Sequence, residues 1–286
     1  MVRMQYSVCL AYEVHDQAAD FIFNFHAAQT ARQTIVAESL QLVPEAPTAL
    51  LTEPALRNRR LRIRAPHGHL AINYAATVDM HHLLTPPQSL FEVRIADLPL
   101  DVIPFLAPSR YCESDRLMEF ARREFGGYQR GYPLVITIRD WVCRYVRFAP
   151  QSTSEQTSAV STLVERRGVC RDYAHLMIAL CRALSIPARF ATSVDYGAAP
   201  ALGPPDFHAF VEVFLGNQWN LVDPSNASVP MGLLRIGTGR DAADVPIAMI
   251  FGHVGVTRPV VEVQALAGSL PDSSMPVETA QGISTW

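Results

Sequence analysis

The chain of 286 residues contains no lysine, so its 24 basic residues are all arginine. Because 27 acidic residues offset them, the net charge is −3, and no excess of positive charge points to a nucleic-acid partner. No uninterrupted apolar run is long enough to cross a membrane. The first residues enter strand-like alternation directly, without the apolar core of a secretion signal. These absences lead us to expect a cytoplasmic protein with no nucleic-acid partner and no membrane contact.

Cysteine is scarce and unpaired in its spacing. The chain has five cysteines and no CxxC pair, at positions Cys9, Cys112, Cys143, Cys170 and Cys181. An odd number without paired spacing argues against a disulfide framework and favours a reducing compartment.

Four histidines lie close together in pairs, at His67 and His69 and at His81 and His82. Neither pair has cysteine or carboxylate partners at the spacing of a metal site. We therefore favour exposed turns over metal ligands, and we expect neither a metal ion nor a cofactor.

The N-terminal third is rich in alternating apolar and polar residues. This pattern predicts strands at residues 6–14, 21–25, 60–64 and 70–78. Pro66-His67-Gly68-His69 lies between the last two and has the composition of a hairpin turn. We expect a small antiparallel β domain that ends at a proline-rich stretch near residue 105.

Helical spacing dominates the next segment, and strands follow it. Helices are predicted at 114–125, 134–148 and 159–166, and a further helix begins at Cys170. Strands are predicted at 188–194, 207–215 and 218–224, with a loop at 197–205. The last residues are small and polar, which predicts a flexible tail.

Cys170 follows Gly168 in the first turn of its predicted helix, where backbone N–H groups lack helical partners and favour an anion. A thiol there is biased toward the nucleophilic thiolate, although Asp172 in the same turn opposes this. Taken alone, Cys170 fits a buried core cysteine better, because most free cysteines are buried. A nucleophile would need a base and a group that orients the base.

A predicted hairpin supplies both. Two strand-like runs flank Gly216-Asn217, and a two-residue turn there would pair Phe210 with Asp223. His208 shares a face with Phe210, so Asp223 lies diagonally across from it, within reach of a hydrogen bond.

These segments resemble a known family. Gly168–Leu176, His208–Val213 and Trp219–Asn226 are similar to the three core motifs of the bacterial transglutaminase-like superfamily. Residues 108–115, 186–189 and 239–246 also match segments usual in it. The similarity is close over residues 105–260 and looser over the preceding β region. It implies a papain-like fold in which Cys170 is the nucleophile, His208 the base and Asp223 the orienting carboxylate.

The sequence departs from the family pattern at three places. Phe210 replaces a tryptophan, Ser225 replaces a threonine, and Ser193–Tyr196 replaces a Ser-Gly-Tyr segment. We expect these changes to affect the walls of the cleft.

The combined reading is an α+β protein with three parts. Residues 1–105 form the antiparallel β domain, 106–265 the papain-like transglutaminase core, and 266–286 a flexible tail. Two further roles stay open. Arg240 and Asp241 form an ion pair that closes a turn or lines the cleft, and Trp141 or Tyr145 could supply a second oxyanion donor.

The predicted activity is cysteine-dependent hydrolysis of amide bonds in a peptide or protein substrate. A transglutaminase would use the same three residues and pass the acyl group to an amine instead of water. A binding module that keeps the fold is the third alternative. The sequence does not predict the oligomeric state.

Overall fold

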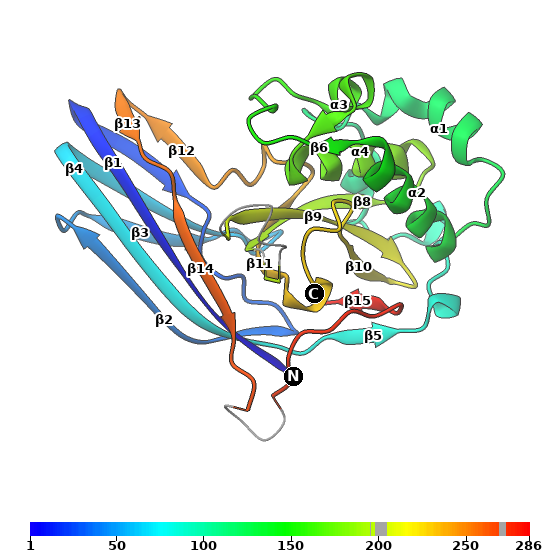
Figure 1. The fold of residues 1–286 in the computed structure, drawn as a ribbon, viewed down its shortest axis with the longest axis horizontal. Helices are drawn as coiled ribbons and strands as arrows, with labels where there is room; N and C mark the ends of the chain where they lie inside the picture. Colours follow the sequence, from blue (N-terminus) through cyan, green and yellow to red (C-terminus); the bar gives the residue numbers. More distant parts are fainter. Residues whose placement is uncertain (195, 198–204, 269–272) are drawn as a thin grey trace.

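Two long strands organise the N-terminal part of the computed structural model, which describes residues 1–194, 196–197, 205–268 and 273–286 (Figure 1). β1 (Val2–Phe23) and β4 (Arg59–Met80) pair antiparallel along nearly their whole lengths. They belong to a seven-stranded sheet in which β12 and β2 flank this pair, β13 and β14 also pair with β1, and β3 pairs with β4. The additional strands are β2 (Gln33–Val43), β3 (Thr48–Thr52), β12 (Ala248–Phe251), β13 (Val254–Val256) and β14 (Val260–Ala265).

The predicted hairpin turn at residues 66–69 is wrong, because β4 continues through it. The pairing of β1 and β4 is interrupted there by a register shift between Val14 and Ala18. Gly68 has a φ of 107°, a conformation that residues with a side chain rarely adopt. The sheet therefore bends at a bulge instead of reversing direction.

A second, six-stranded sheet has the order β11-β8-β9-β10-β15-β5. Its strands are β5 (Leu83–Thr85), β8 (Ala188–Val194), β9 (Phe207–Leu215), β10 (Gln218–Val222), β11 (Leu234–Gly239) and β15 (Gly282–Ser284). The predicted strands at 188–194 and 207–215 are confirmed, and the third ends at Val222, two residues earlier than predicted. Most of the loop expected at 197–205 lies outside the described residues.

Four helices cover one face of the six-stranded sheet (Figure 1). They are α1 (Met118–Phe125), α2 (Tyr132–Tyr145), α3 (Ala159–Glu165) and α4 (Cys170–Ala183). Short 3-10 turns connect the elements, namely η1 (Pro87–Ser89), η2 (Ile95–Asp97), η3 (Ile103–Leu106), η4 (Ser114–Leu117) and η6 (Pro230–Gly232). Two short strands, β6 (Arg147–Phe148) and β7 (Arg167–Gly168), pair in parallel with each other.

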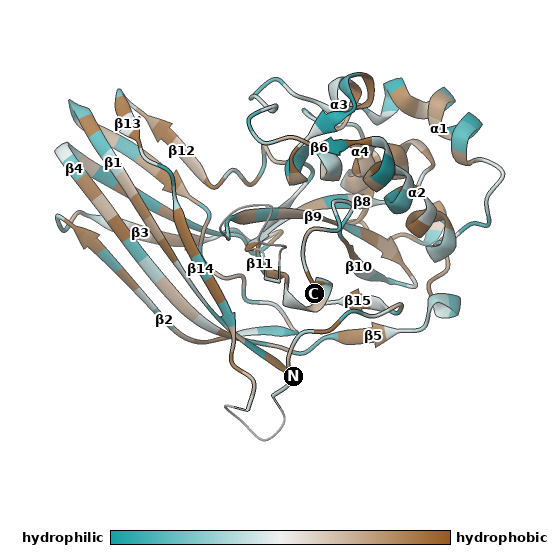
Figure 2. Cartoon of the chain, viewed as in Figure 1, coloured by the Kyte–Doolittle hydropathy of each residue, from teal (hydrophilic) through white to brown (hydrophobic). Residues whose placement is uncertain are grey.

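The six-stranded sheet is the middle layer of three. Ala191, Phe210 and Leu221 pack in one core with the seven-stranded sheet, whereas Phe190 and Val211 pack in a second core with the helices. Figure 2 shows polar and apolar bands alternating along β1 and β4, which fits a sheet with only one buried face. β8 and β9 are buried almost throughout, because both of their faces are covered.

Strand pairing departs from the expected division of the chain at its C-terminal end. Residues 248–265, expected in the catalytic core, pair with β1 of the N-terminal sheet. The predicted flexible tail is wrong for its last residues. Ile283 is buried and pairs with both Leu221 of β10 and Leu84 of β5, so β15 joins two strands of the middle sheet. Residues 269–272 of that segment lie outside the described residues.

Candidate active site

Cys170 is the first residue of α4, and only Val169 separates it from β7. Position 168 requires glycine, because a Cβ on this residue would lie only 2.6 Å from the Cβ of Asp172. Val169 then donates its N–H to Asp172 Oδ2 at 2.9 Å, which caps the helix. These contacts fix the half-buried Cys170 in the first turn, as predicted.

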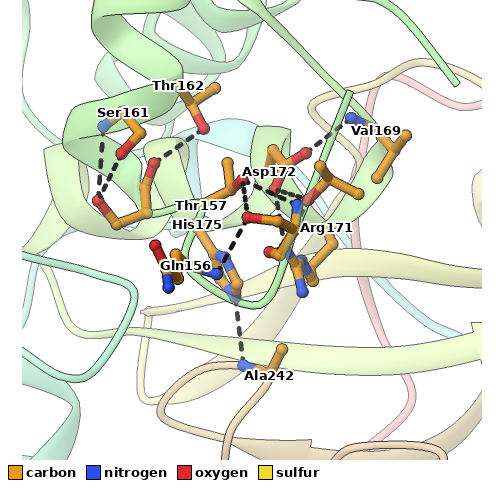
Figure 3. A network of polar contacts seen from close by, with 12 residues as sticks. Gln156, Thr157, Ser161, Thr162, Val169, Arg171, Asp172, His175 and Ala242 are labelled. Carbon is orange, nitrogen blue, oxygen red and sulfur yellow. Dashed lines mark hydrogen bonds and ion pairs between the residues drawn. The ribbon is translucent and has the colours of Figure 1, made fainter. Parts of the chain in front are cut away.

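The Asp172 carboxylate is fully buried and well compensated. Its Oδ1 accepts a hydrogen bond from Thr153 Oγ1 at 3.0 Å and lies 3.4 Å from Arg171 Nη2. Figure 3 shows Asp172 between Val169 and Arg171. The carboxylate is thus engaged in holding the helix start to the segment before α3, a role the sequence reading missed. Its position three residues after the helix cap was the available signal.

The hairpin of β9 and β10 has the predicted register. Gln218 lies opposite Leu215, and the turn residues Gly216 and Asn217 both have positive φ, 59° and 60°. This is the turn that matches the twist of paired strands. It places the end of β10 beside the start of β9.

His208 and Asp223 meet at that point. His208 Nε2 lies 3.2 Å from Asp223 Oδ2, and each residue is only 4% exposed. An ionised carboxylate can only accept, so Nε2 carries the proton. The other carboxylate oxygen, Oδ1, accepts from the Ser225 N–H at 2.9 Å and from the Ser225 hydroxyl at 2.7 Å. Ser225 therefore fixes the orientation of Asp223.

The histidine interacts with both the carboxylate and the thiol. Burial would lower the pKa of His208, but the Asp223 carboxylate and a hydrogen bond with Cys170 raise it well above its ordinary value. For Asp223, burial acts in the opposite direction and would raise the pKa. The charge of His208 and the hydrogen bonds from Ser225 outweigh burial and lower the pKa of Asp223. The three predicted residues thus lie in a row, with His208 in the middle.

A pocket of about 460 Å³ opens beside this row. It is lined by Arg110, Tyr111, Glu155, Cys170, Arg171, Phe190, Thr192, Phe207, His208, Ala209, Ala242, Ala243, Val245, Pro246 and Ile247. Most of the lining is apolar. A substrate carbonyl in this pocket can approach the thiol directly.

Two family profiles match the chain in sequence. The transglutaminase-like superfamily profile matches residues 119–224, and the profile of the bacterial transglutaminase N-terminal domain matches residues 2–101. A crystal structure from Cytophaga hutchinsonii, of a candidate cysteine protease, is 38% identical with a TM-score of 0.90. That alignment covers 100% of this chain and 98% of the other. The chain belongs to the transglutaminase-like superfamily.

Mycobacterial relatives are uncharacterised proteins. One from Mycobacterium leprae is 23% identical over 72% of this chain and 77% of its own. One from Mycobacterium tuberculosis is 35% identical over 40% of this chain and 41% of its own. The superfamily membership also confirms the expected α+β class with a papain-like core and an N-terminal β domain.

The departures from the superfamily pattern that fall on described residues lie away from the pocket walls, contrary to expectation. Phe210 is buried in the core between the two sheets. Ser225 keeps the hydroxyl that a threonine would offer and uses it on Asp223. Tyr196 packs against Gly232, and residue 195 lies outside the described residues.

Neither proposed second oxyanion donor lines the pocket. Trp141 and Tyr145 stack on each other with ring centroids 4.2 Å apart. The Tyr145 hydroxyl accepts a hydrogen bond from Arg166 Nε at 3.0 Å. Both rings therefore belong to the packing of α2.

The expected ion pair of Arg240 with Asp241 is replaced by another. Arg240 Nε lies 3.0 Å from Asp244 Oδ2, four residues further on. Asp241 is buried and accepts backbone N–H groups from Tyr111 and Ala243, each at 2.9 Å. Asp241 thereby ties the segment before α1 to the loop after β11.

Within the described residues, no group of three or more His, Cys, Asp or Glu side chains gathers as a set of metal ligands. The described helices also include none with the length and apolar character that crossing a membrane requires.

Proposed function

We propose that this transglutaminase-like protein is a cysteine-dependent amide hydrolase, acting as a peptidase on a peptide or protein substrate. Cys170 is the nucleophile, His208 the base and Asp223 the carboxylate that orients the base. The contact of buried His208 with both Asp223 and Cys170 carries the proposal. The similarity to a candidate cysteine protease from Cytophaga hutchinsonii supports it.

The first half of the reaction forms a thioester. With its pKa raised, His208 holds the proton that the Cys170 thiol gives up, and the sulfur attacks the substrate carbonyl carbon. The Cys170 and Arg171 N–H groups occupy the first positions of α4 and have no acceptor among the described residues, so they can donate to the oxyanion. His208 then protonates the leaving amine as the C–N bond breaks.

The second half of the reaction regenerates the free enzyme. His208, now neutral, takes a proton from water as the water oxygen attacks the thioester carbonyl. The C–S bond breaks, the acid product leaves, and the proton on His208 restores the starting pair. Asp223 keeps the ring in one orientation throughout, because Ser225 fixes its second oxygen.

Side chains, backbone N–H groups and water suffice for these steps, so we propose no cofactor. We also propose a cytoplasmic location, since all five cysteines are free thiols.

A single experiment separates the acyl acceptors. A library of glutamine-containing peptides is incubated with the protein, with and without a labelled primary amine, and the products are identified by mass spectrometry. The chain contains no lysine and offers no ε-amine, so self-crosslinking is uninformative and the added amine is needed. We expect cleavage of peptide bonds without incorporation of the label.

The control variants are Cys170→Ala and Cys9→Ala. Cys9 is an exposed thiol on β1 of the N-terminal sheet, so its removal should leave turnover intact. Amine incorporation that outpaces hydrolysis and requires Cys170 would assign a transglutaminase instead. Neither product, with a reactive Cys170, would favour the binding module.

A further inference from the structure

His175 is a buried histidine on α4 that the reaction above does not use. It lies five residues after Cys170 and is 0% exposed. Its ring stacks on Tyr111 with centroids 5.0 Å apart and an interplanar angle of 15°, and it packs against Phe190 at 5.2 Å. Its Nε2 accepts the backbone N–H of Ala242 at 3.2 Å (Figure 3).

The three partners of this ring share one property. Tyr111, Phe190 and Ala242 all line the pocket beside Cys170, although His175 itself does not. They come from three separate segments, namely the stretch before α1, strand β8 and the loop after β11. A single side chain of the nucleophile helix therefore supports the pocket from behind in three places.

The bond to Ala242 requires a neutral ring with a free lone pair on Nε2. Burial, together with Arg171 and Arg182, lowers the pKa of His175 well below its ordinary value, so the ring is neutral at pH 7. The proton then resides on Nδ1, which is buried and has no partner within the described chain.

The loop after β11 has other attachments beside Ala242. Arg182 donates to the Arg240 carbonyl at 2.6 Å, and Asp241 accepts the N–H groups of Tyr111 and Ala243, each at 2.9 Å. Ala242, between them, is half-buried, so water can solvate its N–H if the histidine is removed. Loss of the His175 bond should therefore displace the pocket wall without unfolding the loop.

We propose that His175 is a positioning residue for substrate, which holds the Ala242 and Tyr111 walls of the pocket at a fixed distance from Cys170. This inference rests on the proposed function, because it concerns the same pocket. His175 acts on the fit of the substrate and leaves the reactivity of the thiol unchanged, since its ring contacts the pocket walls.

Two electrophiles separate fit from reactivity. Iodoacetamide is small and reports the reactivity of Cys170 alone, whereas Ala-Ala-Phe chloromethyl ketone must place a peptide in the pocket before it alkylates the same sulfur. Second-order rate constants for both are measured at pH 7 by mass spectrometry of the Cys170 peptide. The variants are His175→Phe, which keeps the ring but not the acceptor, and His175→Gln, whose amide oxygen can accept the Ala242 N–H.

We expect the chloromethyl ketone rate to fall fivefold or more in His175→Phe and to return to within twofold of wild type in His175→Gln. The iodoacetamide rate should stay within twofold in both. Hydrogen exchange should be at least tenfold faster at the Ala242 amide in His175→Phe. The matched control is His26→Phe, which replaces a buried histidine that follows β1 and stacks on Phe25, and it should change none of these values.

Other outcomes overturn the inference in distinguishable ways. Unchanged rates in folded His175→Phe would show that the wall does not depend on this side chain. An equal fall with both electrophiles would assign His175 to activation of the thiol, and a failure of His175→Gln to restore the rate would exclude the hydrogen bond as the cause. If neither electrophile labels wild-type Cys170 ahead of the other thiols, the proposed function itself fails.

Discussion

Replacing Glu212 with glutamine should be one of the most damaging single changes outside the candidate active site. Glu212 lies on β9, four residues after His208, and is fully buried between two arginines. Its Oε2 accepts from Arg189 Nε at 2.8 Å and from Arg235 Nη1 at 2.6 Å, and Oε1 accepts from Arg235 Nη2. The cluster links the three strands β8, β9 and β11.

The magnitude follows from the charge balance. Burial would raise the pKa of Glu212, but Arg235 and Arg189 outweigh it and hold the pKa at about 2, against 4.5 for a free carboxyl. At about 1.4 kcal/mol per pH unit, this preference for the ionised form amounts to about 3 kcal/mol. Removing one partner of a buried pair also leaves uncompensated charge, for which losses of about 3–5 kcal/mol are usual. We expect Glu212→Gln to lower the free energy of unfolding by about 3–4 kcal/mol.

Urea unfolding at pH 7, followed by tryptophan fluorescence, measures this loss. The Arg189 guanidinium lies 4.1 Å from the ring centres of both Trp219 and Trp286, so the signal includes the cluster itself. Exposed Glu262 on β14 provides the control, and Glu262→Gln should change the free energy by less than about 0.5 kcal/mol.

The pH dependence gives a second check. Because the folded pKa of Glu212 is depressed, its contribution is complete above about pH 4.5 and is lost as the pH falls toward 2. In Glu212→Gln, the loss of unfolding free energy between about pH 4.5 and pH 2 that comes from protonation of Glu212 should be missing. A loss below about 1 kcal/mol at pH 7 would refute the reasoning, because the two arginines would then not depend on the carboxylate.

Three further predictions concern other parts of the chain. Asp223→Asn removes the charge that raises the pKa of His208, so iodoacetamide labelling of Cys170 should require a higher pH than in wild type. An unchanged pH profile of labelling would contradict the proposed roles of Asp223 and His208. Burial lowers the pKa of His26 to about 4, so unfolded chains bind its proton more readily below pH 6.5. His26 should therefore contribute about 2 kcal/mol to the loss of stability between pH 8 and pH 5, and His26→Phe should reduce the difference seen in urea unfolding by about that amount. Gly168→Ala should lower the free energy of unfolding in urea by about 1–3 kcal/mol, because the added methyl group would lie 2.6 Å from the Cβ of Asp172. A variant as stable as wild type would show that the start of α4 can shift to accommodate the methyl group.

The helix and the hairpin that build the site could be predicted from the sequence, because the residues that determine each of them lie close together in the chain. A helix that starts at Cys170 follows from the glycine before it and the apolar spacing after it. The hairpin follows from Gly216-Asn217, whose positive φ values only a few residues tolerate, and its register brings His208 and Asp223 together. Turn chemistry and strand periodicity act over a few residues and can be read directly.

What depends on distant parts of the chain was decided only by the tertiary structure. The polar end of the chain was predicted to be flexible from its composition. In the structure, Ile283 pairs between Leu221 and Leu84, and the open edges of their strands cannot be recognised in the sequence. Likewise, the sequence shows His175 on one helix face but not the Tyr111 and Ala242 segments that meet it. Backbone groups at a sheet edge and the walls of a pocket take their partners from whichever segment folding brings near, and no local pattern encodes that choice.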